Sequence, residues 1–439
     1  MRTTGSAAAP SLPPRATVTS GTVTVGAGLV ILGVSASVYL VVTARAVGPV
    51  EFASVSTLWT LVYTFGIGAF LPFEQELGRA LAHRAELAQG GAPVVARVAA
   101  VAGGVLLTLL LAGALLSPAL VHRLFAGHRA ELFAFGAALA VMAAQYVSRG
   151  VFSGSGRFGW YSAQLGIEGV VRTAACAGLF ALGIHGTSWY VWLLAAAPLV
   201  ALAATAPGMY GAGPAVRPGP SASWSEVSAN LGWLLTAALC AQGVANAAIV
   251  ALRLLSPGGD AAGQFLAAFV IARIPLFLFQ AVQAALLPGL ARALAAADAA
   301  GFRRELRRVL AATGLVGMVG VLGAAAAGPE ALGLAFGAGF ELGRADIVVL
   351  AAGTALYMLA LVFQAGLLAR ARHRDNALCW ALALAVFAAA CALPVAALAR
   401  VELALILSSA VAAGALGARL LRSAGRRAVP VPTIGEEPR

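Results

Sequence analysis

Long apolar runs recur along the whole chain, and short segments rich in polar residues separate them. Each run has about 20 residues, the length that a helix needs to cross the hydrocarbon core of a bilayer. The pattern predicts twelve membrane-spanning helices, at residues 22–44, 53–73, 93–116, 131–152, 160–183, 186–207, 227–252, 261–289, 308–328, 345–369, 376–398 and 401–421. We therefore expect an all-α polytopic membrane protein.

The composition agrees with lipid as the solvent of this chain. Hydrophobic residues make up 61% of it and charged residues only 10%, whereas a soluble domain has about 25% charged residues. The four cysteines all lie within apolar runs, and they do not cluster with the five histidines. We therefore expect no metal site, no disulfide framework and no cofactor, although coupling to a proton or another ion stays open.

The arginines indicate how the chain is oriented in the membrane. The net charge is +12, and every basic residue is an arginine, which together with the many alanines and glycines indicates a GC-rich bacterial genome. With the N-terminus in the cytoplasm, 21 arginines fall inside and six outside. This asymmetry predicts cytoplasmic N- and C-termini in a bacterial cytoplasmic membrane. Because the arginines lie mostly between apolar runs, the basic charge reflects topology and not a nucleic-acid partner.

One basic segment stands just before the ninth predicted span. In the sequence GFRRELRRVL, Arg303 and Arg307 are four residues apart, as are Arg304 and Arg308. A helix would carry both pairs along one face. We expect these four arginines to contact anionic lipid head groups, with substrate contact as the alternative.

The two halves of the chain resemble each other. The stretch LFAGHRAELFAF…YVSRGVFSGSGRF resembles AFGAGFELGRAD…VFQAGLLARARHR, and FLPFEQELGRALA resembles LLPGLARALAAAD. The matched residues are Phe125 with Phe336, Gly154 with Ala369, Arg157 with Arg372, and Pro72 with Pro288. Matches at nearly the same offset indicate six duplicated helices. An even number of helices in each copy places the two copies parallel, and transporters built from repeats hold substrate near the midplane between them.

The duplication sets the expected domains. We predict a disordered cytoplasmic tail at 1–21, an N-terminal lobe at 22–208, a cytoplasmic loop at 209–225, a C-terminal lobe at 226–422 and a second cytoplasmic tail at 423–439. The loop is rich in Gly, Pro and Ser, which is typical of a linker.

Arg172 and Arg273 each lie near the middle of a predicted span, one in each half. A charge at that depth costs about 2.5–3.5 kcal/mol and usually faces a protein interior or a water-filled cavity. Pro275 follows Arg273 closely and is expected to kink the helix there.

Polar neighbours extend these two sites. Glu168 stands four residues before Arg172, with Tyr161 on the same face, and a structural ion pair is the alternative interpretation. Gln242 and Asn246 are also four apart, and their alternative is hydrogen bonding between helices. Gln280 shares a helical face with Arg273. The candidate substrate-binding residues are therefore Arg273, Arg172, Glu168, Gln280, Gln242, Asn246 and Tyr161. Such a cavity would carry net positive charge and suit a phosphate, because arginine binds two oxygens at once.

Three stretches resemble the polysaccharide flippases of the multidrug/oligosaccharidyl-lipid/polysaccharide (MOP) superfamily, which include the Wzx-type exporters. They are GPVEFASVSTLWTLV, GQFLAAFVIARIPLFLFQAVQAALLPGLARA and AFGAGFELGRADIVVLAAGTALYMLALVFQAGLLARARHR. The resemblance implies two six-helix lobes around a V-shaped cavity, as in MATE-like proteins. It also implies a flippase that carries an undecaprenyl-diphosphate-linked oligosaccharide to the outer leaflet by alternating access. Arg273 and Arg172 would receive the diphosphate, and membrane enzymes of glycan assembly are candidate partners. Relatives often have fourteen helices, whereas this chain predicts twelve.

Other functions fit the sequence less well. A cation-coupled multidrug or metabolite exporter of the same fold needs buried carboxylates, and only Glu168 stands at midplane depth, with Glu74 and Glu76 nearer a helix end. A transporter of the major facilitator type would carry a G-x-x-x-D-R pattern, which GRALAHRAELAQGGAPVVAR lacks. An enzyme of glycan assembly is disfavoured because the predicted outer loops are short.

Overall fold

The first two spans are joined into one long element that a glycine divides. In the computed structural model, which describes residues 16–224, 230–256, 261–276, 298–337 and 339–424 together with three isolated positions before 298, α1 runs from Ala16 to Glu86. Gly48 breaks it with φ 78° and ψ 169°, a left-handed φ that glycine adopts without a Cβ clash. Pro49 follows and begins the second helix, where its missing N–H has no helical partner to lose.

Helices account for the other regular elements of the described residues, which contain no strand. The N-terminal half continues with α2 (Ala92–Leu115), α3 (Ser117–Ala119), the π-helix η1 (Leu120–Leu124), α4 (Arg129–Gly154), α5 (Phe158–Ala181), α6 (Thr187–Tyr210) and the 3₁₀ helix η2 (Gly213–Val216). The C-terminal half contains α8 (Leu231–Leu255), α9 (Ala261–Ala272), α11 (Ala299–Phe336), α12 (Arg344–Ala369), α13 (His373–Ala390) and α14 (Ala397–Ala424). The all-α architecture and the expected number of about twelve spans are confirmed.

Several element boundaries differ from the sequence prediction. The first helix begins at Ala16, inside the segment expected to be a disordered tail. α13 ends at Ala390 and not near 398, since Leu393 and Pro394 lie in a turn between helices. Most of the eighth span beyond residue 276, and the tail beyond 424, lie outside the described residues.

The described helices fit a multi-pass membrane protein. Eight of them are long and apolar enough to cross a membrane, namely α1, α2, α4, α6, α8, α11, α12 and α14. α1 does so twice because it is broken at Gly48. α5 has 24 residues but is not among these eight. It carries Glu168 and Arg172, which are both buried against other helices.

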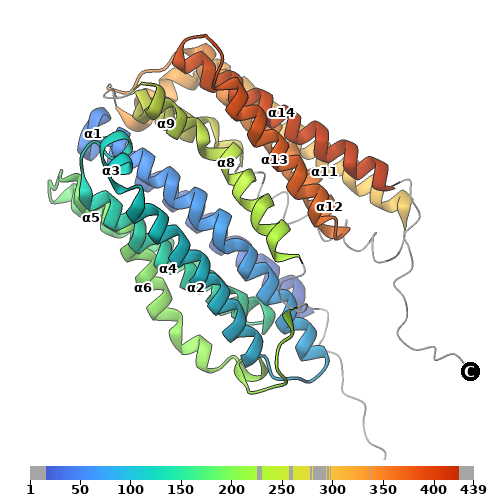
Figure 1. Cartoon of the computed structure of the whole chain (residues 1–439). Coiled ribbons are helices and arrows are strands. Elements are labelled where there is room, and N and C mark those ends of the chain that lie inside the picture. The colour runs from blue at the N-terminus through green and yellow to red at the C-terminus, as the bar shows by residue number, and fades with distance from the viewer. Residues whose placement is uncertain are drawn as a thin grey trace, which may run out of the picture.

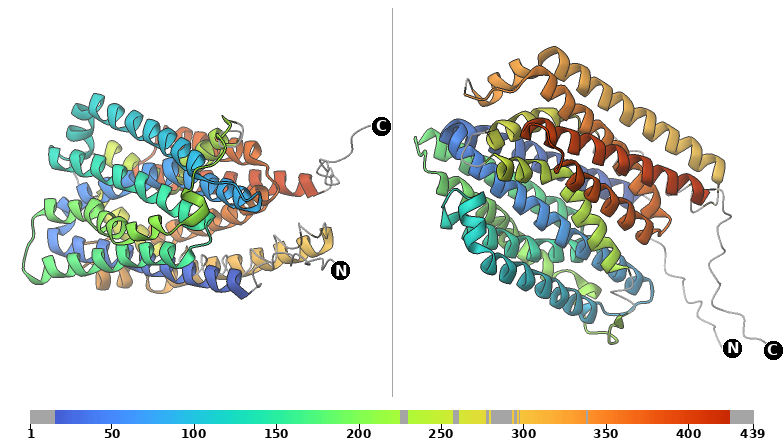
Figure 2. Two further views of the ribbon diagram at one scale, coloured as in Figure 1. Left: turned by 90° about the horizontal axis from the view of Figure 1, so that it is seen from below. Right: turned by 45° about the horizontal axis from the view of Figure 1, so that its top comes forward.

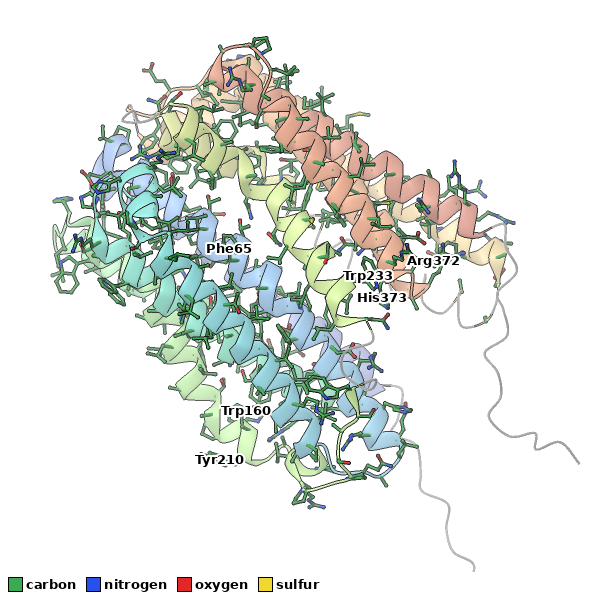
Figure 3. The ribbon with its side chains drawn as sticks, viewed as in Figure 1. Phe65, Trp160, Tyr210, Trp233, Arg372 and His373 are labelled. Atoms are coloured by element: carbon green, nitrogen blue, oxygen red, sulfur yellow. The ribbon has the colours of Figure 1, made fainter. Side chains whose placement is uncertain are left out.

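The helices form two lobes, α1–α6 (the N-lobe) and α8–α14 (the C-lobe). The ribbons lie together at the end that holds Gly48 and diverge toward the end where α1 starts and α14 finishes (Figures 1 and 2). At this divergent end, Trp160 and Tyr210 belong to the N-lobe, and Trp233, Arg372 and His373 to the C-lobe (Figure 3). The first residue of α1 and the last of α14 are therefore on the same side, as an even number of spans requires.

Direct contacts close the converging end between the lobes. The ring of Phe52 on α1 lies 6.2 Å from Phe336 of α11 and 5.7 Å from Phe340, measured between centroids. The Arg45 Nε donates a hydrogen bond of 2.7 Å to the carbonyl of Ala335. Gly263 of α9 allows a close approach, since a Cβ there would lie 2.9 Å from the Pro49 carbonyl oxygen.

The duplication inferred from sequence is visible in the helix boundaries. α4 and α12 both have 26 residues, and α5 and α13 start the same 215 positions apart as α4 and α12 do. Before α5, Gly156 has φ 71°, and before α13 its counterpart Ala371 has φ 54°. Arg157 and Arg372 then precede the two helices with φ/ψ of −88°/54° and −87°/53°. The two lobes therefore repeat a helix–turn–helix unit.

The loop after α6 is fixed to the N-lobe. The Arg84 guanidinium, which is buried, donates hydrogen bonds of 2.8 Å to the Gly90 carbonyl and 2.9 Å to the Pro220 carbonyl. Arg97 of α2 donates to the Ala222 carbonyl, and its guanidinium carbon lies 4.7 Å from the centre of the Trp224 ring. The loop is thus held along its length up to Trp224.

A glycine sets the distance between α1 and α8. A Cβ on Gly68 would lie 3.1 Å from the Leu239 Cα, so a larger side chain must push the two helices apart. We expect Gly68→Leu to destabilise the protein by about 1–3 kcal/mol, the usual cost of overpacking, seen as a lower midpoint of thermal unfolding in detergent. Gly26→Leu on the same helix is the matched control, because a Cβ there meets nothing within 4 Å. Equal midpoints for the two variants would contradict the close packing.

Candidate functional site

A helix break positions Arg273. α9 ends at Ala272, and the chain turns tightly, with the Arg273 amide donating to the Val270 carbonyl at 3.2 Å and the Leu276 amide to the Arg273 carbonyl at 2.9 Å. Pro275 causes the break because it lacks an N–H and its ring excludes the carbonyl four residues earlier. The ring packs against Gly320 of α11, where a Cβ would lie 2.3 Å from the Pro275 Cγ.

The Arg273 side chain is held by neutral groups. Its Nη1 donates a hydrogen bond of 3.2 Å to the Asn246 Oδ1, and its Nη2 donates to the Ala245 carbonyl. The guanidinium carbon lies 4.0 Å from the centre of the Phe269 ring, which is a cation–π geometry. Asn246 in turn donates to the Gln242 Oε1 at 3.1 Å. Arg273 is only partly buried, and within the described part of the chain no carboxylate pairs with it.

A second cluster lies inside the N-lobe and is centred on Glu168. Arg172 donates to the Glu168 Oε1, and the Arg149 Nη2 donates to its Oε2 at 3.0 Å. The Gln145 Nε2 donates to the same Oε2 at 3.1 Å. All four side chains are buried, and Arg172 is only 1% exposed. One carboxylate is therefore shared between two guanidinium groups, which leaves the cluster with a formal charge of +1.

Gln164 connects this cluster to α6. Its Oε1 accepts from the Arg149 Nε at 3.1 Å, and its Nε2 donates to the Thr205 Oγ1 and the Ser148 Oγ, both at 3.0 Å. Gln164 and Thr205 are almost fully buried. The amide therefore links a charged interior to hydroxyl groups nearer the outer face of the lobe.

Glu74 and Tyr161 form a neighbouring pair. The Tyr161 hydroxyl donates a hydrogen bond of 2.6 Å to the Glu74 Oε1. The Glu74 Oε2 is buried and has no hydrogen-bond partner among the described residues. A buried carboxylate oxygen without a donor is costly as an ion, so this group is a candidate to hold a proton or a cation.

The structure brings some of the predicted site residues together and separates others. Gln242, Asn246 and Arg273 form one cluster, and Glu168 and Arg172 belong to another. The two arginines share no described contact, and Arg172 faces Glu168 and not an opening. This geometry fits the alternative of a structural ion pair for Glu168–Arg172. Gln280 lies outside the described residues.

Most of the Glu168 cluster was not predicted from the sequence. Arg149 is one of the 21 arginines that were counted on the cytoplasmic side as loop residues. The structure places it within α4, 5% exposed and paired with Glu168, so its assignment to a loop is wrong. The spacing of Gln145 and Arg149, four residues apart as Glu168 and Arg172 are, was a signal for a polar face on α4. Tyr161 was predicted to belong to the same site as Glu168. Its hydroxyl instead bonds to Glu74 of α1, 87 positions earlier in the sequence.

The arginine-rich segment lies on the first turns of α11. Asp298 caps this helix, with its Oδ1 accepting from the amides of Ala300 at 3.0 Å and Gly301 at 2.8 Å. The four arginines are exposed. They line a hollow of about 510 Å³, together with Ala300 and Ala311. Head-group contact at this hollow stays a prediction.

We expect neutralising this segment to weaken the binding of anionic lipid. Each arginine near a charged surface contributes about 1 kcal/mol, so Arg303→Gln/Arg307→Gln should lower the retention of phosphatidylglycerol by roughly thirtyfold. Native mass spectrometry of the purified protein would measure it, and Arg419→Gln/Arg422→Gln near the end of α14 is the control. Unchanged retention would contradict the head-group interpretation.

Solved structures share this architecture. An inward-facing MATE family multidrug resistance transporter of the MOP superfamily matches with a TM-score of 0.68 and 12% identity, over 90% of this chain and 98% of that one. The MATE multidrug transporter DinF-BH matches with 0.64 and 15%, over 93% and 95%. A mutant of the Vibrio cholerae MATE transporter VcmN matches with 0.62 and 15%, over 93% and 98%. This chain has the MATE fold.

The likeness is one of fold. No family model matches the sequence, and no curated protein sequence matches it. Within the MATE fold, the TM-score is 0.68 for the inward-facing structure and 0.61 for an outward-facing one.

Proposed function

We propose that this protein is a flippase for a lipid-linked anionic substrate of the undecaprenyl-diphosphate oligosaccharide class. The MATE fold supports transport by alternating access between two lobes. The excess of arginine near one side of the membrane supports a cytoplasmic location for both chain ends. With that orientation, the lobes diverge toward the cytoplasm, where such a substrate is assembled.

The observation that carries the proposal is the state of Arg273. Its guanidinium lies at a helix break within the predicted bilayer span, on a residue that is only partly buried, and it has no carboxylate partner in the described part of the chain. A cation at that depth is costly, so an anion that binds and leaves would relieve the cost in each cycle. A diphosphate is suited to this site because the planar guanidinium can donate to two of its oxygens.

The neighbouring groups keep Arg273 ready for an anion. Asn246 and the Ala245 carbonyl occupy two of its donors, and Phe269 covers one face of the group. They fix its orientation without neutralising its charge. The +1 charge of the Glu168 cluster adds a weaker positive potential from the N-lobe.

A cation-coupled multidrug exporter is the second candidate function. The specific observation in its favour is Glu74, a buried carboxylate with one oxygen that no described residue satisfies. The structural neighbours are described as multidrug transporters, which agrees with this alternative.

One reconstitution distinguishes the two functions. The purified protein in liposomes would be offered a fluorescent undecaprenyl-diphosphate disaccharide, and its exposure to an external quencher would be followed. In parallel, uptake of a cationic rhodamine dye would be followed under an imposed proton gradient. The proposal expects accelerated exchange of the lipid and no dye uptake. Dye uptake without lipid exchange would replace it by the exporter.

A further inference from the structure

A groove on the membrane-facing surface of the N-lobe has no role in the site described above. It has a volume of about 550 Å³ and runs along α4, between α2 and α6, which both pack against α4 (Figure 1). Its lining is almost entirely alanine, glycine and larger apolar side chains. Ala99 and Gly103 of α2 and Ala203 of α6 are exposed at its rim, whereas Ala143 and Phe152 are buried at its floor.

The position of the groove selects a hydrocarbon chain as its occupant. Its lining on α4 extends from Ala140 to Phe152, about 18 Å of helix, compared with about 30 Å for a bilayer core. α4 ends at Gly154 on the divergent side, so the groove lies in the inner-leaflet half in the proposed orientation. The hydrocarbon that surrounds the protein at that depth is lipid chains, which match the apolar lining of the groove.

The floor of the groove is connected to the buried charges. Ser148 and Thr205 line the groove, and both hydroxyls accept from the Gln164 Nε2 at 3.0 Å. Gln164 accepts from Arg149 at 3.1 Å, and Arg149 pairs with Glu168. A chain in the groove therefore contacts the outer end of a hydrogen-bonded path that leads to the charged interior of the lobe.

We propose that this groove binds the polyisoprenoid tail of the substrate while its head group is in the transporter; this inference rests on the proposed function. The small side chains leave room for the methyl branches of an isoprenoid. The path through Gln164 connects an occupied groove to the buried charges. A groove that binds phospholipid tails without selectivity would not need such a connection. The tail thus stays in the inner leaflet on one side of the N-lobe.

Two matched pairs of substitutions test the groove. A Cβ on Gly103 or on Gly104 would meet nothing within 4 Å, and both residues are exposed on α2, but only Gly103 lines the groove. Gly103→Phe should fill it, and Gly104→Phe is the control. On α6, Ala203→Phe and Ala204→Phe form the second pair, since both are exposed and only Ala203 lines the groove.

The probe is a polyprenyl diphosphate with a photoreactive diazirine in its tail, added to the full-length protein in nanodiscs. We expect cross-links on α2, α4 and α6 within the groove, found by peptide mass spectrometry. Gly103→Phe and Ala203→Phe should lower this labelling about tenfold, because a filled groove excludes several methylene groups, while the controls label normally. Unlabelled undecaprenyl phosphate should compete, and phosphatidylglycerol should not.

The other outcomes would rule out either the groove or the proposed function. Equal competition by phosphatidylglycerol would show that the groove binds lipid tails without selectivity, and would end the inference. Normal lipid exchange in Gly103→Phe, or no labelling in a wild-type protein that exchanges the lipid, would also end it and leave the proposed function standing. No lipid exchange by the wild-type protein would instead remove the proposed function.

Discussion

Arg273→Ala is expected to lower exchange of a lipid-linked diphosphate by at least about a hundredfold while leaving membrane insertion intact. Hydrogen bonds to a charged group contribute about 1.5–3 kcal/mol each, and the guanidinium can donate two to a diphosphate. Losing both corresponds to a factor of that size. The measurement is the initial rate of lipid exchange in liposomes with equal amounts of purified protein.

The lysine variant sharpens this test. Arg273→Lys keeps the charge but loses the planar pair of donors, so its rate should fall between those of wild type and Arg273→Ala. Arg123→Ala is the matched control, because Arg123 is exposed and lies in η1, away from the helix break at Arg273. Wild-type exchange by Arg273→Ala would remove this residue from the mechanism. A loss of folded protein in membranes would instead show a structural role.

Glu168→Gln is expected to have the largest effect on stability. Its carboxylate is the shared partner of Arg149 and Arg172, which are 5% and 1% exposed. Removing one member of a buried ion pair costs about 3–5 kcal/mol because it leaves a buried charge without compensation, and here two charges lose their partner. We expect a strongly reduced yield of folded protein and a lower midpoint of thermal unfolding, both measured by size-exclusion chromatography with fluorescence detection.

Removing the charges together separates a structural role from coupling. A triple variant, Arg149→Gln/Glu168→Gln/Arg172→Met, should be milder than Glu168→Gln alone if the cluster is structural. Glu305→Gln is the control, because it breaks the exposed pair with Arg308, where solvent screens the interaction. A Glu168→Gln protein of normal stability whose transport no longer depends on pH would show that this acid carries a coupling proton.

The architecture could be predicted from the sequence because the signals that define it are local. A run of about 20 apolar residues predicts one membrane-spanning helix by itself. A repeated stretch such as the one containing Arg157 and Arg372 indicates a duplication by itself. Pro275 likewise indicated the helix break beside Arg273, since a proline acts on the carbonyl four residues before it.

The candidate site was harder to predict because its contacts are distant in sequence. Charge counting assigns each arginine to the nearest loop, and so it placed Arg149 in the cytoplasm. Its partner Glu168 is 19 residues away on another helix, and no local pattern records that pairing. The same holds for Tyr161 and Glu74. Burial of a charge depends on which helices pack together, and periodicity alone does not fix this.

The loop that Arg84 and Arg97 hold against the N-lobe limits how far the lobes can move. The chain is anchored as far as Trp224 and α8 starts at Leu231, so only six residues, 225–230, connect the anchored loop to the C-lobe. The seven Cα-to-Cα steps from Trp224 to Leu231 span at most about 25 Å. This length is the largest separation that Trp224 and Leu231 can reach while the loop stays anchored to the N-lobe, so it limits how far the lobes can move apart at this connection.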